Sequence, residues 1–140
     1  MNAFQKYFIQ TITKRYADFS GRVRRSEYWY FSLFSILFFT VVMILTTQLI
    51  YAGAAIFANI LLLIGVLIFA IPRLAVSVRR LHDIGKSGWF ILFGFILLVG
   101  FILLLVFYLT DSEPRTNKWG PNPKAGNLPS AADLLLTRFK

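Results

Sequence analysis

The sequence predicts an all-α integral membrane protein, with three transmembrane helices and an N-terminal amphipathic interfacial helix. The chain of 140 residues is 57% hydrophobic and 15% charged, with a mean hydropathy of +0.66, whereas soluble domains are about a quarter charged. Residues 28–72 and 87–110 contain no Asp, Glu, Lys, Arg or His. Uncharged apolar runs of this length are typical of membrane-spanning helices.

The first expected element is an amphipathic helix over residues 3–19. One face carries residues that recur at steps of three and four: Phe4, Tyr7, Phe8, Thr11, Ile12, Tyr16 and Phe19. An aromatic face beside basic residues is typical of a helix that lies in the headgroup plane. A helix packed on the rest of the protein is the alternative, and the two arrangements are compatible.

The first apolar run is too long for one span. A single helix over it would measure roughly 67 Å, against a hydrocarbon core of about 30 Å. We therefore expect it to fold back near residues 51–54, with spans over about 29–51 and 55–72. Gln48 and Asn59 would then lie level with each other, where their amides can hydrogen-bond across the hairpin. The alternative is that each amide reaches water at the outer interface.

The second apolar run predicts a third span over about 88–110. Gly85 is a suitable stop for the preceding helix, and Ser87 is a suitable cap for the next one. We expect residues 1–124 to form one membrane domain. Residues 125–140 are expected to form a polar C-terminal extension.

The distribution of cations predicts the orientation. The net charge is +9, with six Lys and Arg in the N-terminal segment, four after the second span, and none in the turn at 51–54. The positive-inside rule therefore places the N-terminus in the cytoplasm. Cations that flank apolar runs also favour anionic lipid headgroups over nucleic acid as a partner. Three spans would place the C-terminal tail on the far side.

Basic residues near the first and second spans form the candidate site. The residues expected to contact an anionic ligand are Arg22, Arg25, Arg79, Arg80 and His82, because Arg pairs bidentately with phosphate and carboxylate. The alternative is two basic collars that set the topology, with Glu27 and Asp83 paired to nearby arginines.

His82 is the single histidine of a chain without cysteine, so neither a zinc site nor another cofactor is expected. Its neighbour Asp83 points about 100° away on a helix, so the two cannot form a catalytic dyad there. We interpret His82 first as a structural hydrogen-bonding residue and second as a ligand contact.

Three motifs occur in order around the apolar runs. They read FxGRxxRxEYW at 19–29, RRLHDxGxSGW at 79–89 and NxxGPxP at 117–123. Together they resemble the bacterial inner-membrane family named domain of unknown function 805, over about residues 16–124. Phe90 departs from the pattern, since many members have a second Trp there.

The resemblance implies a small multi-span protein of the bacterial inner membrane. It implies no activity, because none is assigned to the family as a whole. The first two motifs are polar beyond what an anchor requires, so we expect them to form one site. If the third motif joins that site, the tail must be cytoplasmic and residues 88–110 must form a re-entrant hairpin.

The expected function is therefore that of a small membrane interaction or regulatory protein, not an enzyme. Its basic cytoplasmic face would bind anionic lipid headgroups, a protein partner or a second copy of the chain. One alternative is a small transporter or an accessory subunit of one, although the spans contain no ionisable residue. Another is a membrane enzyme that acts on lipid headgroups through His82.

Overall fold

The computed structural model describes residue 2 and residues 4–125. Every regular element in this part of the chain is a helix, which confirms the all-α prediction. The elements are η1 (Gln5–Ile9), α1 (Gln10–Thr13), α2 (Arg25–Tyr51), α3 (Ala55–Asp83), η2 (Gly88–Phe95) and α4 (Val99–Leu109). The polar extension predicted for 125–140 lies outside the described residues except for Ala125.

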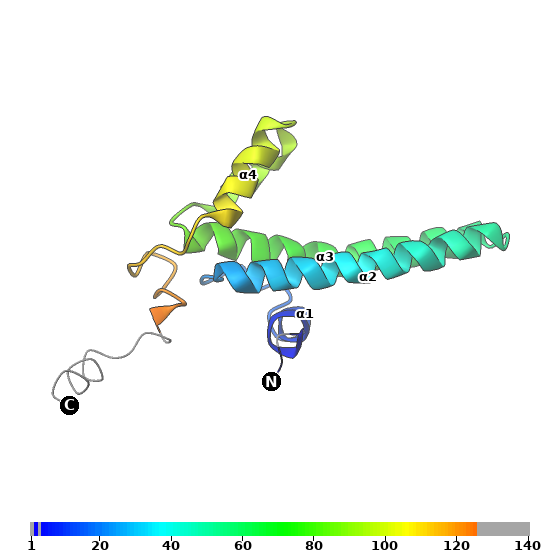
Figure 1. Cartoon of the computed structure of the whole chain (residues 1–140), viewed down its shortest axis with the longest axis horizontal. Coiled ribbons are helices and arrows are strands. Elements are labelled where there is room, and N and C mark those ends of the chain that lie inside the picture. Colours follow the sequence, from blue (N-terminus) through cyan, green and yellow to red (C-terminus); the bar gives the residue numbers. More distant parts are fainter. Residues whose placement is uncertain (1, 3, 126–140) are drawn as a thin grey trace, which may run out of the picture.

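Helices α2 and α3 form a long antiparallel hairpin (Figure 1). They are joined at 52–54, where Gly53 has a φ of 82°, a conformation that glycine adopts without strain. This confirms the predicted reversal. Both helices are long and apolar enough to cross a membrane.

The hairpin interface contains small residues on both helices. Ser35 and Thr46 of α2 and Ala58 and Gly65 of α3 are buried, while most of the large apolar side chains of both helices point outward. Small buried residues with a large apolar exterior are typical of helices that pack in lipid, because close backbone approach supplies the contact.

The amide pair predicted across the hairpin does not form. The Gln48 and Asn59 side chains are both exposed, and no hydrogen bond joins them in the described structure. Gln48 lies four residues before the turn at 52–54, and Asn59 lies five residues after it. Both amides are therefore near the end of the hairpin, where the alternative expected them.

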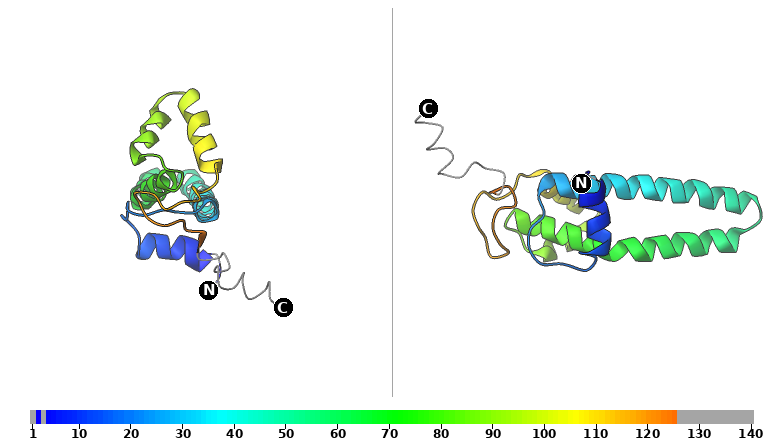
Figure 2. Two further views of the ribbon diagram at one scale, coloured as in Figure 1. Left: turned by 90° about the vertical axis from the view of Figure 1, so that its left-hand side faces the viewer. Right: turned by 90° about the horizontal axis from the view of Figure 1, so that it is seen from below.

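The N-terminal helix is shorter than predicted and packs on the hairpin. It ends at Thr13, and in the turn that follows the Asp18 carboxylate accepts the backbone N–H of Ser20 at 3.0 Å. The Phe8 ring is buried, with ring centroids 5.8 Å from Phe31 and 5.9 Å from Phe69. Figure 2 shows the helix lying across α2 and α3.

The third predicted span is not one helix. Residues 88–110 divide into η2 and α4, and the chain reverses between them at 96–98. Leu98 is the residue that turns, with a φ of 59°. The two short helices form a second hairpin on the face of α2 and α3 opposite α1 (Figure 2, left). The run is long enough for one span, so hydropathy alone could not distinguish the two arrangements.

Gly100 makes this second reversal possible. A Cβ at this position would collide with the backbone carbonyl of Phe93, whereas a Cβ at Gly94 would meet only the flexible Leu104 side chain at 3.3 Å. We therefore expect Gly100→Ala to destabilise the protein by about 1–3 kcal/mol, because the backbone must shift to admit the methyl group. Gly94→Ala is the matched control and should change the unfolding midpoint in detergent little. Equal midpoints for the two variants would contradict the close approach.

The second hairpin returns the chain to its starting end. Residues 110–125 pack against residues 20–27 and the end of α3, so the third motif lies beside the first two (Figure 1). The plain three-span arrangement, in which the tail lies on the far side, is therefore not confirmed. The hairpin at 88–110 agrees with the alternative in which all three motifs lie at one end of the molecule. We call residues 20–27, 79–87 and 110–125 the head.

Candidate functional site

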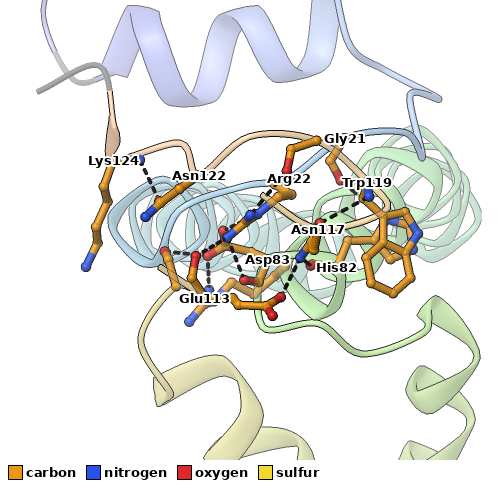
Figure 3. Close-up of polar contacts among 12 residues, drawn as sticks. Gly21, Arg22, His82, Asp83, Glu113, Asn117, Trp119, Asn122 and Lys124 are labelled. Atoms are coloured by element: carbon orange, nitrogen blue, oxygen red, sulfur yellow. Dashed lines mark hydrogen bonds and ion pairs between the residues drawn. The ribbon is translucent and has the colours of Figure 1, made fainter. Parts of the chain in front are cut away.

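Asp83, the last residue of α3, is the centre of the head. Its side chain is fully buried. One carboxylate oxygen accepts Arg22 Nε at 3.1 Å, and the other accepts Arg80 Nη1 at 2.5 Å and the Ser112 hydroxyl at 2.6 Å. Each of the three segments of the head therefore contributes to one buried charge network (Figure 3).

Arg22 holds the segment 113–120 in place. Its Nη1 donates to the carbonyls of Arg115 at 2.8 Å and Gly120 at 3.3 Å. Its Nη2 donates to the carbonyls of Glu113 at 2.6 Å and Asp83 at 3.1 Å. With Nε bound to Asp83, all five N–H donors of this guanidinium are used. Arg22 therefore has no donor left for a ligand.

Arg80 ties the end of α4 to α3. Its side chain is fully buried, and it donates to the carbonyls of Tyr108 and Thr110 as well as to Asp83. Two guanidiniums and one carboxylate thus share a site closed to water. Removing the carboxylate would leave both guanidiniums buried without a counter-ion, which costs free energy.

His82 lies in the same head and contacts the other two segments. Its ring stacks on Trp119 at 4.4 Å between centroids, and Nδ1 lies 3.3 Å from the carbonyl of Gly21. Asn117 donates to the His82 carbonyl at 2.9 Å and to the Glu113 carboxylate at 2.8 Å. Figure 3 shows these side chains between the three segments. The contacts agree with the first interpretation of His82, a structural hydrogen-bonding residue.

The remaining predicted site residues lie elsewhere. Arg25 is exposed, and its Nη1 donates to the Leu109 carbonyl at 3.2 Å. Arg79 and Glu27 line a cavity beneath the N-terminal helix. The predicted set therefore divides into a buried network, an exposed cation and a separate cavity. Of the two predicted acidic partners, Asp83 joins the network and Glu27 lines the cavity.

Sequence reasoning missed several participants in the head. Ser112 and Glu113 belong to none of the motifs, and Trp119 stands at a variable position within the third motif. Asn117 is the exception, because it opens that motif. The third motif is therefore the sequence signal that indicates a tail at the same end of the molecule as the first two motifs.

The surface around the network is basic. The exposed cations of the head and of the segment after α1 are Lys14, Arg15, Arg25, Lys86, Arg115 and Lys118. Ser20, which hydrogen-bonds Asp18 beside Arg15, holds the pKa of that carboxyl below its usual value. No cluster of three or more His, Cys, Asp or Glu side chains suited to a metal ion occurs among the described residues.

The match to a known family follows the same three motifs. The family model described as "Protein of unknown function (DUF805)" matches residues 16–121, which include all of the head up to Pro121. The chain belongs to the DUF805 family. The matched region contains every residue of the buried network.

Two similar proteins are the Escherichia coli (strain K12) inner membrane proteins YhaH and YhaI. The chain is 37% identical to YhaH over 113 residues, which cover 81% of this chain and 93% of that protein. It is 35% identical to YhaI over 117 residues, covering 84% and 95%. No solved structure matches this chain.

Proposed function

We propose that this chain is a bacterial inner-membrane interaction protein whose cytoplasmic head binds anionic lipid headgroups. The observation that carries the proposal is the division of the cations. The guanidiniums of Arg22 and Arg80 donate to Asp83 and to backbone carbonyls, whereas the cations around them are exposed. The buried network builds a stable support, and the exposed cations supply the binding surface.

In the proposed topology, only α2 and α3 cross the membrane. Residues 31–51 measure roughly 30 Å at 1.5 Å per residue, which equals the thickness of the hydrocarbon core. The N-terminal helix and the η2–α4 hairpin leave the head on opposite sides and lie in the cytoplasmic leaflet. Irregular backbone at the reversal 96–98 is tolerable there because it stays near the polar interface.

The inner-membrane location is supported by the relatives, both of which are named inner membrane proteins. The orientation is supported by the positive-inside rule, since the basic residues gather at the head and the turn at 52–54 has none. The transporter and headgroup-enzyme alternatives stay predictions, because no contact among the described residues favours either.

Tryptophan quenching by brominated lipids tests the proposal. Trp29 lies one helical turn from Arg25, Trp89 lies three residues after Lys86, and both rings are exposed. In proteoliposomes, brominated phosphatidylglycerol should quench these rings at lower mole fractions than brominated phosphatidylcholine. Each cation near an anionic surface is worth about 1 kcal/mol, so Arg25→Gln with Lys86→Gln should reduce the preference roughly 10- to 30-fold.

The matched control exchanges the cations and keeps their charge, as Arg25→Lys with Lys86→Arg. It should retain the preference for phosphatidylglycerol, and raising the salt concentration should weaken that preference in both the wild type and the control. Equal quenching of the wild type by the two lipids would contradict anionic-lipid binding. The basic surface would then be assigned to a protein partner.

A further inference from the structure

A second site, separate from the buried network, lies beneath the N-terminal helix. A partly open cavity of about 170 Å³ lies between that helix, α2 and α3. This volume is far more than one water molecule requires. Its polar lining comes from Gln10, Thr11, Arg15, Glu27 and Arg79. Residues of the N-terminal segment, α2 and α3 therefore converge on a space that lies apart from the buried network around Asp83.

Arg79 is the feature that points to a ligand. It is 1% exposed, yet its Nη2 has no hydrogen-bond partner, the only such buried side-chain nitrogen or oxygen in the described part of the chain. Its Nε donates to the Ala75 carbonyl at 3.4 Å, and its Nη1 lies 4.0 Å from the Asp18 carboxylate. Both contacts are long for a guanidinium.

Arg79 differs from the neighbouring Arg80 in how many of its N–H donors have partners. Arg80 donates to a buried carboxylate and to two carbonyls, whereas Arg79, one residue earlier on α3, lines the cavity and has one donor, Nη2, without a partner. Leaving a buried charged donor unsatisfied costs free energy. An oxyanion in the cavity would satisfy it.

The charges around the cavity limit the kind of anion. The groups that act electrostatically on Arg79 are Asp18, Arg15 and Glu27. The two arginines and two carboxylates sum to no net charge, so the surroundings offer no excess positive charge to balance the second charge of a dianion. A phosphodiester carries one negative charge, and Arg binds phosphate oxygens in fixed geometry.

We propose that this cavity binds the phosphodiester of a phospholipid headgroup, with Arg79 donating to a phosphate oxygen and exposed Arg15 contacting it from the mouth. The inference rests on the proposed location of the head at the membrane surface, where headgroups reach the underside of the interfacial helix. The Arg79 site differs from the exposed basic surface in the chemical group that it recognises. The exposed cations select lipids with a net negative charge, whereas the Arg79 site selects the phosphodiester, which zwitterionic lipids also carry.

Binding of short-chain lipids to the full-length protein in a phosphate-free maltoside detergent tests this site. The probes are dihexanoylphosphatidylcholine, dihexanoylglycerol, which lacks the phosphate, and inorganic phosphate, each measured by titration calorimetry. Phosphatidylcholine should bind saturably, dihexanoylglycerol at least tenfold more weakly, and inorganic phosphate more weakly than phosphatidylcholine. Because phosphatidylcholine is zwitterionic, this result does not depend on the anionic-lipid preference of the basic face.

The decisive variant is Arg79→Gln, which should weaken phosphatidylcholine binding at least tenfold. Lys14→Gln removes an exposed cation next to Arg15 and should bind as the wild type does. If Arg79→Gln does not fold, Arg15→Gln replaces it, because Arg15 is exposed, and should weaken binding at least threefold. Wild-type affinity in the Arg79 variant, or in Arg15→Gln when it stands in, would overturn the site. Inorganic phosphate binding as tightly as the lipid would overturn the lipid as its source.

Discussion

Asp83→Asn should destabilise the protein by about 3–5 kcal/mol, the cost of breaking a buried ion pair by removing one partner. The substitution keeps the size of the side chain but removes its charge. The guanidiniums of Arg22 and Arg80 then remain buried without a counter-ion, and the new amide N–H₂ group faces one of them. Because the Asp83 carboxylate joins all three segments of the head, the three segments should unfold together in one cooperative transition.

Chemical unfolding in detergent measures this effect. Trp119 stacks on His82 within the head, so its fluorescence reports the loss of local structure. Variants that replace Trp29 and Trp89 with Phe isolate its signal. The transition midpoint should fall sharply in Asp83→Asn relative to the same background.

Asp111→Asn is the matched control. Asp111 is 63% exposed and pairs with Lys124 at the surface, and exposed pairs contribute about 0–1 kcal/mol. The control should therefore unfold close to the wild type. If the two variants lost similar stability, the buried network would not be the support of the head.

Tyr51→Cys should be labelled from outside the cell, whereas Lys14→Cys and Lys124→Cys should not. The chain contains no cysteine, so single substitutions report cleanly. Tyr51 is 84% exposed at the far end of the α2–α3 hairpin. Lys14 follows α1, and Lys124 belongs to the head on the same end, because the η2–α4 hairpin returns the chain there.

The measurement is labelling of intact cells with a membrane-impermeant maleimide, repeated after permeabilisation. Lys14→Cys and Lys124→Cys should react only in permeabilised cells, an all-or-none difference. If Lys124→Cys but not Lys14→Cys were labelled from outside, residues 88–110 would cross the membrane as one helix. Labelling of both lysine positions from outside would keep the hairpins but reverse the orientation.

Much of the fold could be predicted from the sequence for a physical reason. A charge-free run longer than twice the length needed to cross a bilayer must fold back, and the reversal near 51–54 followed from that length alone. The amphipathic spacing of Phe4, Phe8 and Ile12 likewise predicted the N-terminal helix. Its end at Thr13 was missed, and the turn that follows contains a local hydrogen bond from Ser20 to Asp18.

The sequence by itself determined the helical class, the reversal of the first apolar run, and the end of the molecule where the cations gather, because length, hydropathy and charge are properties of local segments. Only the tertiary structure decided that 88–110 folds back and that Arg80 is saturated while Arg79 faces a cavity. The acceptors for Arg22 and Arg80 are mostly backbone carbonyls of distant residues, and every residue type carries one. Their arrangement depends on how segments pack, which no pattern of side chains reveals.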